Sequence, residues 1–241
     1  MKAVLRTRWD LAPRAAMRLQ ERLRERVILE DRHGEIRFVA GADLAFEPET
    51  NEAVAGVIVF SFPEMKEVER RHAWRKLRFP YVPGLLSFRE TPVLMAAFRK
   101  LRTEPDLILI DGHGLAHPRR FGIACHVGVI FDKPTIGCAK SLLVGEHRAL
   151  GLKKGSTAPL MHHGERVGVA LRTRDGVKPI YVTQGHRVSL ARAVRIVGQS
   201  LDGFRIPKPT READHYVREL RRRDTDVIIQ RPLSVWEGRK L

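Results

Sequence analysis

One short apolar run that ends in a carboxylate constrains this chain most. Residues 107 to 110 are Leu-Ile-Leu-Ile, and Asp111 follows directly, with Gly-His-Gly after it. Four consecutive apolar residues bounded by turn residues predict a short buried strand. An ionised carboxylate beside a core costs several kcal/mol unless it is paired or binds a cation. Two interpretations stay open: Asp111 starts an ordinary Asp-Gly turn, or it belongs to a site.

Two more acidic residues follow strand-like runs upstream. Asp43 lies in Ile-Arg-Phe-Val-Ala-Gly-Ala-Asp, and Glu90 closes the segment Tyr-Val-Pro-Gly-Leu-Leu-Ser-Phe-Arg-Glu. Oxygen ligands suit Mg²⁺ or Mn²⁺, so three such carboxylates favour a site for a hard cation. A zinc site is the weaker alternative, because the nearby cysteines and histidines fit no closed ligand spacing. Cys125 and Cys138 lie in apolar surroundings and are expected to be core thiols.

The segment from Phe79 to Glu90 contains a stiff loop. Pro80 and Pro83 flank Tyr81 and Val82, and each proline fixes its own φ and restricts the residue before it. A rigid loop that presents an aromatic ring and then returns to a carboxylate is more than a plain connection requires.

These motifs together resemble the endonuclease V family. The resemblance rests on Asp43-Leu-Ala-Phe, on Pro80-Tyr-Val-Pro-Gly followed by Arg-Glu90, and on Asp111-Gly-His-Gly-Leu-Ala-His-Pro-Arg-Arg-Phe-Gly. It continues through Gly-Cys-Ala-Lys140-Ser, Gly185-His-Arg-Val-Ser and Pro-Thr-Arg-Glu-Ala-Asp214, and it covers residues 10 to 222. Two departures, Leu-Ala-Phe after Asp43 and Val-Thr-Gln before Gly185, touch no expected metal ligand.

The resemblance implies an RNase H-like α/β fold, a mixed β-sheet with helices on both faces. It also implies a Mg²⁺-dependent nuclease in which Mn²⁺ substitutes for Mg²⁺. Asp43 and Asp111 would bind the metal, and Glu90, Lys140 and Asp214 would complete the catalytic group. Two structural alternatives remain: Asp214 as a carboxylate favoured by the dipole in a helix's first turn, and Lys140 as a lysine extending to solvent from a strand end.

The resemblance further implies how the substrate is recognised. Tyr81 would act as a wedge that fills the base stack after the damaged base is turned out. Contacts with the substrate are expected from Tyr81, Pro83, Gly84, Leu86, Gly112, His117, Gly122, Ile123 and Leu143. The alternatives are ordinary turns for the glycines, a surface aromatic for Tyr81, and a structural role for His117.

The resemblance implies one catalytic domain over residues 1–222, followed by a C-terminal tail over 223–241 that is docked or disordered. Strands are expected at 36–45, 53–62, 66–76, 106–111, 134–139, 166–173 and 180–184. Helices are expected at 12–26, 90–102, 119–131, 189–201 and 210–222. Strands followed by alternating helices and strands indicate a mixed α/β sheet.

Charge indicates the class of partner. The chain of 241 residues has 44 Lys and Arg against 28 Asp and Glu, a formal net charge of +16. Such an excess favours a polyanion, although charge alone separates neither DNA from RNA nor an enzyme from a binding module. No apolar run is long enough to span a bilayer, and the N-terminus lacks an apolar signal core. The expectation is a cytoplasmic monomer without a membrane partner.

The expected activity combines these points. The resemblance implies an endonuclease that nicks DNA at the second phosphodiester bond 3′ to deoxyinosine and leaves 3′-hydroxyl and 5′-phosphate ends, as in repair of deaminated adenine. One alternative is the same chemistry on inosine-containing RNA. The other is a nucleic-acid-binding module whose carboxylates are structural.

Overall fold

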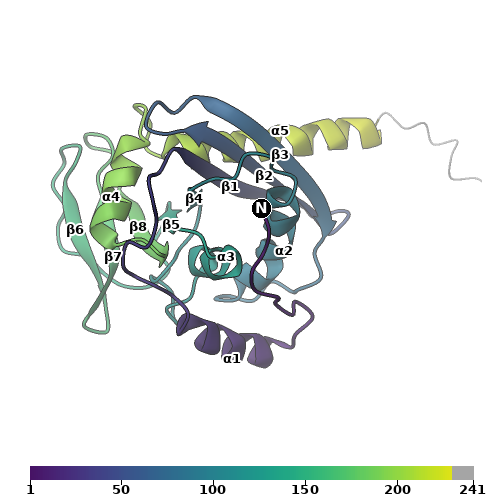
Figure 1. Ribbon diagram of the computed structural model, residues 1–241, viewed down its shortest axis with the longest axis horizontal. Coiled ribbons are helices and arrows are strands. Elements are labelled where there is room, and N and C mark those ends of the chain that lie inside the picture. Colours follow the sequence, from purple (N-terminus) through teal and green to yellow (C-terminus); the bar gives the residue numbers. More distant parts are fainter. Residues whose placement is uncertain (230–241) are drawn as a thin grey trace, which may run out of the picture.

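Eight strands form a single sheet in the computed structural model, which describes residues 1–229, with side chains to residue 222. Along the chain the strands are β1 (Phe38–Glu47), β2 (Glu52–Ser61), β3 (Glu67–Lys76), β4 (Leu107–Ile110), β5 (Thr135–Ala139), β6 (Thr157–His162), β7 (Glu165–Leu171) and β8 (Ile180–His186). The helices are α1 (Pro13–Arg24), α2 (Leu86–Phe98), α3 (Ile123–Phe131), α4 (Leu190–Gln199) and α5 (Lys208–Ile229), and Figure 1 shows them around the sheet.

The order of the strands across the sheet is β3-β2-β1-β4-β5-β8-β7-β6. The first three strands form an antiparallel meander, as short turns between consecutive strands predict. Strands β1, β4 and β5 are parallel neighbours in the middle of the sheet. The mixed sheet expected from the sequence is therefore confirmed.

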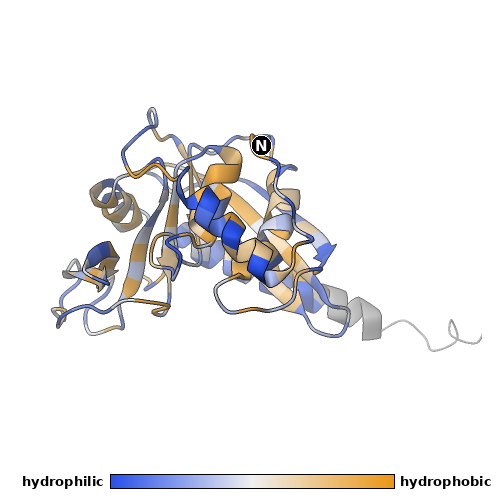
Figure 2. Ribbon diagram, turned by 90° about the horizontal axis from the view of Figure 1, so that it is seen from below, coloured by the Kyte–Doolittle hydropathy of each residue, from blue (hydrophilic) through white to orange (hydrophobic). Residues whose placement is uncertain are grey.

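Helices cover both faces of this sheet. One core contains Val93 and Phe98 of α2 and Val127 of α3, packed on the alternating side chains Ala40 and Ala42 of β1. A second core on the other face joins α4 and Tyr216 of α5 to residues such as Val39, Leu107 and Leu109. Helix α1 lies apart from the sheet over α3, and its outer side, toward the viewer in Figure 2, is strongly hydrophilic.

The structure differs from the expected elements at several points, and two of the differences concern site residues. Asp43 lies in the middle of β1 rather than at its end, because β1 continues to pair with β2 as far as Glu47. Glu90 lies inside α2, which begins at Leu86 and not at residue 90. Strand β6 was not expected at all.

The fourth difference concerns the expected tail. Helix α5 runs to Ile229, so residues 223–229 continue the helix that the sequence analysis ended at 222. Residues 230–241 lie outside the described part of the chain. Among residues 1–229, each helix is too short or too polar to cross a membrane.

Candidate metal and nucleic-acid site

The register between β1 and β4 places two aspartates side by side. Ala42 is the partner of Ile110 in this parallel pair, and Asp43 and Asp111 are the next residues along the two strands. Side chains alternate along a strand, so Asp43 shares a face with Val39, and Asp111 shares a face with Leu109. Both apolar residues belong to the core beneath α4 and α5. The two carboxylates therefore lie on the face that α5 covers.

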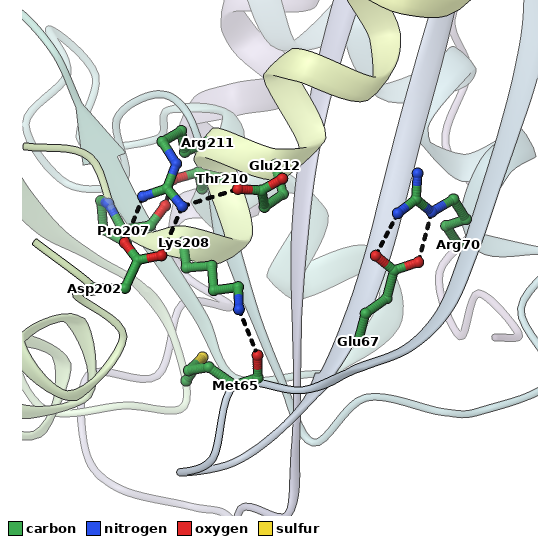
Figure 3. A network of polar contacts seen from close by, with 9 residues as sticks. All are labelled: Met65, Glu67, Arg70, Asp202, Pro207, Lys208, Thr210, Arg211 and Glu212. Atoms are coloured by element: carbon green, nitrogen blue, oxygen red, sulfur yellow. Dashed lines mark hydrogen bonds and ion pairs between the residues drawn. The ribbon is translucent and has the colours of Figure 1, made fainter. Parts of the chain in front are cut away.

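Helix α5 brings Asp214 to the same face because its start approaches β1 closely. A Cβ atom on Gly41 would lie 1.9 Å from the carbonyl oxygen of Pro209, so only glycine permits this approach. Lys208 Nζ donates to the carbonyl oxygen of Met65 at 2.9 Å. Arg211 pairs with Asp202 (Figure 3). These contacts fix the first turns of α5 and hence the position of Asp214.

Lys140 follows β5 and supplies a positive charge among these carboxylates. Its ammonium forms an ion pair with Asp111 and lies 4.0 Å from the nearer carboxylate oxygen of Asp214. Arg218, one turn further along α5, approaches the same oxygen of Asp214 at 3.0 Å. The acidic side chains raise the pKa of Lys140 against the opposing effect of burial, so its ammonium stays charged.

Glu90 reaches the group from α2, on the opposite face of the sheet. Burial, and then the negative charge of Asp111, raise its pKa to about 7, with Arg89 opposing. The same two causes raise the pKa of Asp43 to about 8, while the backbone N–H of Leu44 and the ammonium of Lys140 oppose the shift. Asp214 adds to the repulsion on Asp43. The four carboxylates thus form one electrostatically linked group.

This donor set fits a hard divalent cation. Crowded, partly buried carboxylates with raised pKa values are in excess over the nearby positive charge, and a cation with oxygen ligands relieves that excess. As the side chains lie, no three His, Cys, Asp or Glu residues within the described part of the chain form a ready metal cage. Asp111 is engaged with Lys140 instead. A cavity of about 400 Å³ lies next to the group. It is lined by Leu44, Asp214, Val217 and three arginines of α5.

Residues 80–84 form the loop that carries the expected wedge Tyr81, and we name it the wedge loop. It is fixed in place through one backbone carbonyl group, that of Gly84. The carbonyl oxygen of Gly84 accepts hydrogen bonds from Gln20 Nε2 (3.1 Å), His117 Nε2 (3.0 Å) and Arg119 Nη2 (2.6 Å). Gly84 itself has φ of +76°, which disfavours any residue with a Cβ. The loop fixed in this way leaves Tyr81 71% exposed, and the neighbouring Leu86 is also exposed.

His117 supports this loop through both of its ring nitrogens. The side chain is buried, its Nδ1 accepts from the backbone N–H of Arg119 at 3.2 Å, and its Nε2 faces Gly84. A neutral ring protonated on Nε2 satisfies both contacts. Burial and the charge of Arg119 lower its pKa to about 4. These contacts give His117 a structural role, and its expected contact with the substrate stays a prediction.

The other expected pocket residues lie on neighbouring loops. A Cβ on Gly112 would come within 2.7 Å of the Ile123 side chain, and one on Gly122 would come within 2.2 Å of the His113 carbonyl oxygen. His113 Nε2 in turn lies 3.0 Å from the carbonyl oxygen of Ser141. Beyond Ser141 the side chains Leu142 and Leu143 are exposed. Segments 112–117, 122–123 and 141–143 are therefore adjacent, and their role in substrate recognition stays a prediction.

Three residues that position the site were not predicted from the sequence. Gln20 is fully buried in α1, and a polar residue on an amphipathic helix gives no sign that it will hold a distant carbonyl. Arg119 also holds Gly84, and it pairs with Gln20 Oε1 at 2.6 Å. Arg218 was detectable, because it stands four residues after Asp214 in a predicted helix.

Comparison with known proteins agrees with this geometry. The family model for endonuclease V matches residues 21–215. The chain belongs to the endonuclease V family. It is 49% identical to endonuclease V of Myxococcus xanthus over 222 residues. The matched region covers 92% of this chain and 94% of that protein. Homologues of this kind support a nuclease, a hydrolase of phosphodiester bonds.

Solved endonuclease V structures share the fold. The Streptomyces avermitilis protein is 41% identical, with a TM-score of 0.86 over 90% of this chain and 96% of that one. The Bacillus subtilis protein is 32% identical, with a TM-score of 0.89 over 94% and 99%. Endonuclease V of Ciona intestinalis, 28% identical with a TM-score of 0.78 over 88% and 99%, was solved with a 23-mer DNA containing an inosine followed by a ribo-adenosine. The RNase H-like fold expected from the sequence is confirmed.

Proposed function

We propose that this endonuclease V is a Mg²⁺-dependent enzyme that nicks DNA at the second phosphodiester bond 3′ to deoxyinosine, leaving 3′-hydroxyl and 5′-phosphate ends. One observation carries the proposal: the β1–β4 register places Asp43 beside Asp111, and Lys140 and Asp214 lie against them. A deaminated adenine in DNA would be its substrate in repair.

Asp43 and Asp111 would hold the metal, with Mn²⁺ able to replace Mg²⁺. When bound, a divalent ion activates water and stabilises charge on the phosphate and on the leaving oxygen. Glu90 and Asp214 flank this pair and can orient a water molecule or take its proton. The ammonium of Lys140 stands next to Asp111 and can offset the negative charge that develops on the phosphate.

Recognition would come from the wedge loop and from the loops around Gly112. Tyr81 is exposed and rigidly presented, as a ring that enters a base stack must be. Backbone groups near Gly84, Gly112 and Gly122, with the apolar side chains of Ile123 and Leu143, would surround the displaced hypoxanthine. Pro83 and Leu86 would border the same pocket.

Inosine-containing RNA is a second candidate substrate. The DNA bound by the Ciona relative carries a ribonucleotide directly after its inosine, which favours inosine-containing RNA as an alternative. A strand that contains riboinosine, with the same sequence as the deoxyinosine strand, compares the two substrates directly.

The deciding experiment uses the purified protein, Mg²⁺ and an end-labelled duplex with one central deoxyinosine, with the product length resolved to a nucleotide. The expected product ends one nucleotide beyond the lesion. Asp111→Asn should reduce cleavage by about three orders of magnitude or more, because the ion supplies several kcal/mol of stabilisation. Its binding to the lesion in EDTA should persist.

Asp10→Asn is the matched control, because Asp10 is a carboxylate in an exposed surface pair with Arg8. Binding of the lesion without any Mg²⁺-dependent product from the wild type would identify a binding module and overturn the proposal. Faster cleavage of the riboinosine strand would assign the enzyme to RNA.

A further inference from the structure

A basic groove lies outside the carboxylate group, between α2 and β3. Its volume is about 610 Å³, and we name it the α2–β3 groove. The residues that form its cationic lining are Arg75, Lys76, Arg78, Arg89 and Arg99, and Glu52 is its one acidic residue. Apolar and aromatic side chains, Trp9, Trp74, Phe79 and Phe88 among them, complete the wall.

Within the described part of the chain, most of the positive charge of this groove is not neutralised, because its one acidic residue, Glu52, lies opposite Lys76 alone in the β2–β3 pair. Arg75, Lys76 and Arg78 are exposed, and none of them forms an ion pair in the part of the chain that the structure describes. Nearby, Arg70 and Arg71 of the same strand do have partners, Glu67 and Glu69. Clustered cations without acidic partners repel one another, and a polyanion in the groove relieves that repulsion.

The groove adjoins the wedge loop and the helix that carries Glu90. Phe79 lies in its wall, two residues before Tyr81. Arg89, the residue before Glu90, donates from Nη1 to the carbonyl oxygen of Phe79 at 2.9 Å. The same guanidinium lies 4.9 Å from the ring centre of Phe46, near the end of β1. The groove therefore begins beside the wedge loop, and Arg89 connects its lining to the helix position of Glu90.

The apolar wall of the groove is rigid. The Trp9 ring packs edge-on to Phe88 at 6.0 Å between centres and lies 5.2 Å from the ring of His126. The N-terminal amine donates to the carbonyl oxygen of Phe98, which holds the segment before Trp9 along α2, where Figure 1 places the N-terminus. A fixed apolar wall with cations at its rim suits a sugar–phosphate backbone, which has apolar sugar faces and regularly spaced anions.

We propose that the α2–β3 groove binds the sugar–phosphate backbone of one of the two duplex arms that flank the lesion, namely the arm next to Tyr81. The inference rests on the proposed function for the identity of the substrate, and it adds the surface that holds the flanking duplex. Contacts of this kind carry no sequence information, so the groove strengthens binding to damaged and undamaged DNA alike.

The test compares two triple variants that lose the same charge. The groove variant is Arg75→Ala, Lys76→Ala and Arg78→Ala. The control is Lys153→Ala, Lys154→Ala and Arg174→Ala, three exposed cations near β6 and β7, at the other edge of the sheet from β3. Equal thermal unfolding midpoints establish that both variants are folded. Affinity is measured in EDTA by fluorescence anisotropy, over a series of salt concentrations.

On an inosine duplex with two long arms, the groove variant should bind roughly ten- to a hundredfold more weakly than wild type. Its salt slope should fall by about two to three, because each lost phosphate contact removes about 0.9. The control should change both quantities much less. Cutting one arm back to a few base pairs should remove the difference between the groove variant and wild type, and cutting the other arm should preserve it.

Equal losses in the groove variant and the control would overturn the proposal, since net charge alone would then explain them. A loss that is the same whichever arm is shortened would also overturn it. The proposed function is judged separately, by whether the wild type nicks the inosine strand when Mg²⁺ is added. A wild type that binds without nicking would refute that function while the affinities still decide the groove.

Discussion

At the scale of single residues, the carboxyl group of Asp43 lowers the stability of the fold at a position that the proposed function requires. Burial and the neighbouring Asp111 raise its pKa to about 8, far above the ordinary value for aspartate. A side chain chosen for stability at this position would carry no charge. Proteins commonly keep such groups where activity requires them, at a cost in stability.

The raised pKa of Asp43 predicts a pH dependence of stability in the metal-free protein. Between about pH 4 and about pH 8 the folded protein holds a proton on this group and the unfolded chain does not. The unfolded state then binds fewer protons, so the free energy of unfolding falls as pH rises, by at most about 1.4 kcal/mol per pH unit. Asp43→Asn should remove the part of this dependence that Asp43 contributes, and the raised pKa of Glu90 should maintain the remainder.

Thermal unfolding in EDTA checks this expectation across that pH range. The variant should gain in melting temperature over wild type, and the gain should grow toward the alkaline end. Asp10→Asn, which changes an exposed carboxylate, should follow the wild-type curve. Parallel curves for Asp43→Asn and wild type would show that Asp43 titrates normally.

At the scale of elements, the wedge loop combines a fixed base with an exposed tip. Three donors from α1 and from the segment after β4 converge on the carbonyl of Gly84, and Tyr81 extends from the loop they hold. Because the loop is ordered before DNA binds, little conformational entropy remains to be lost on binding.

Tyr81→Ala should weaken binding to inosine-containing duplex by about ten- to a hundredfold, since base–aromatic stacking contributes roughly 1–3 kcal/mol. The loss should be smaller on single-stranded inosine, where no base pair has to be broken. Tyr81→Phe keeps the ring and serves as the control. Equal losses on duplex and single strand for the Ala variant would leave Tyr81 as a packing residue of the loop.

Elements with a strong local signal could be predicted, and those decided by distant packing could not. The apolar runs of β4 and β5 lead directly to Asp111 and Lys140, so the sequence placed both residues. Glu90 was placed on a strand end because helix α2 starts in Leu-Leu-Ser-Phe, a segment that also suits a strand. Its helical form follows from packing of Leu85 and Phe88 against Phe79 and α1, which overrides local preference.

Strand β6 was not predicted from the sequence, for a different reason. Pro159 lies within it, and a proline inside a run argues against a strand. The strand is nonetheless at the edge of the sheet, paired only with β7 among the named strands, so the missing N–H can face away from the ladder. The position of β6 at the edge of the sheet allows the strand to contain a proline. A local sequence pattern does not show where in the sheet a strand will lie.

At the scale of the whole molecule, the net charge of +16 sets how strongly the protein holds any nucleic acid. Composition shows the excess, whereas its placement emerges only from the fold: three arginines of α5 lie by the carboxylates, and four more and a lysine lie in the α2–β3 groove. The charge that attracts DNA is therefore arranged in two places, beside α5 and beside α2.

Binding to undamaged duplex should weaken steeply between low and physiological salt, because phosphate contacts release counterions. The preference for inosine over adenine in the same duplex should change much less, since the expected pocket contacts are uncharged. Titrations of both duplexes over the same salt series measure the two quantities. A flat response of the undamaged duplex would contradict a polyanion-binding role for the charge.

The pairing of Ala42 with Ile110 has a consequence for how preparations of this protein are judged. Moving β1 by one residue against β4 would turn Leu44 toward α5 in place of Asp43, because successive side chains point to opposite faces. Such a chain could keep its secondary structure and its charge while losing one of the two central carboxylates. Under the proposed function, the number of titratable cation sites per mole of chain therefore counts the molecules whose first strand is in register, which circular dichroism does not measure.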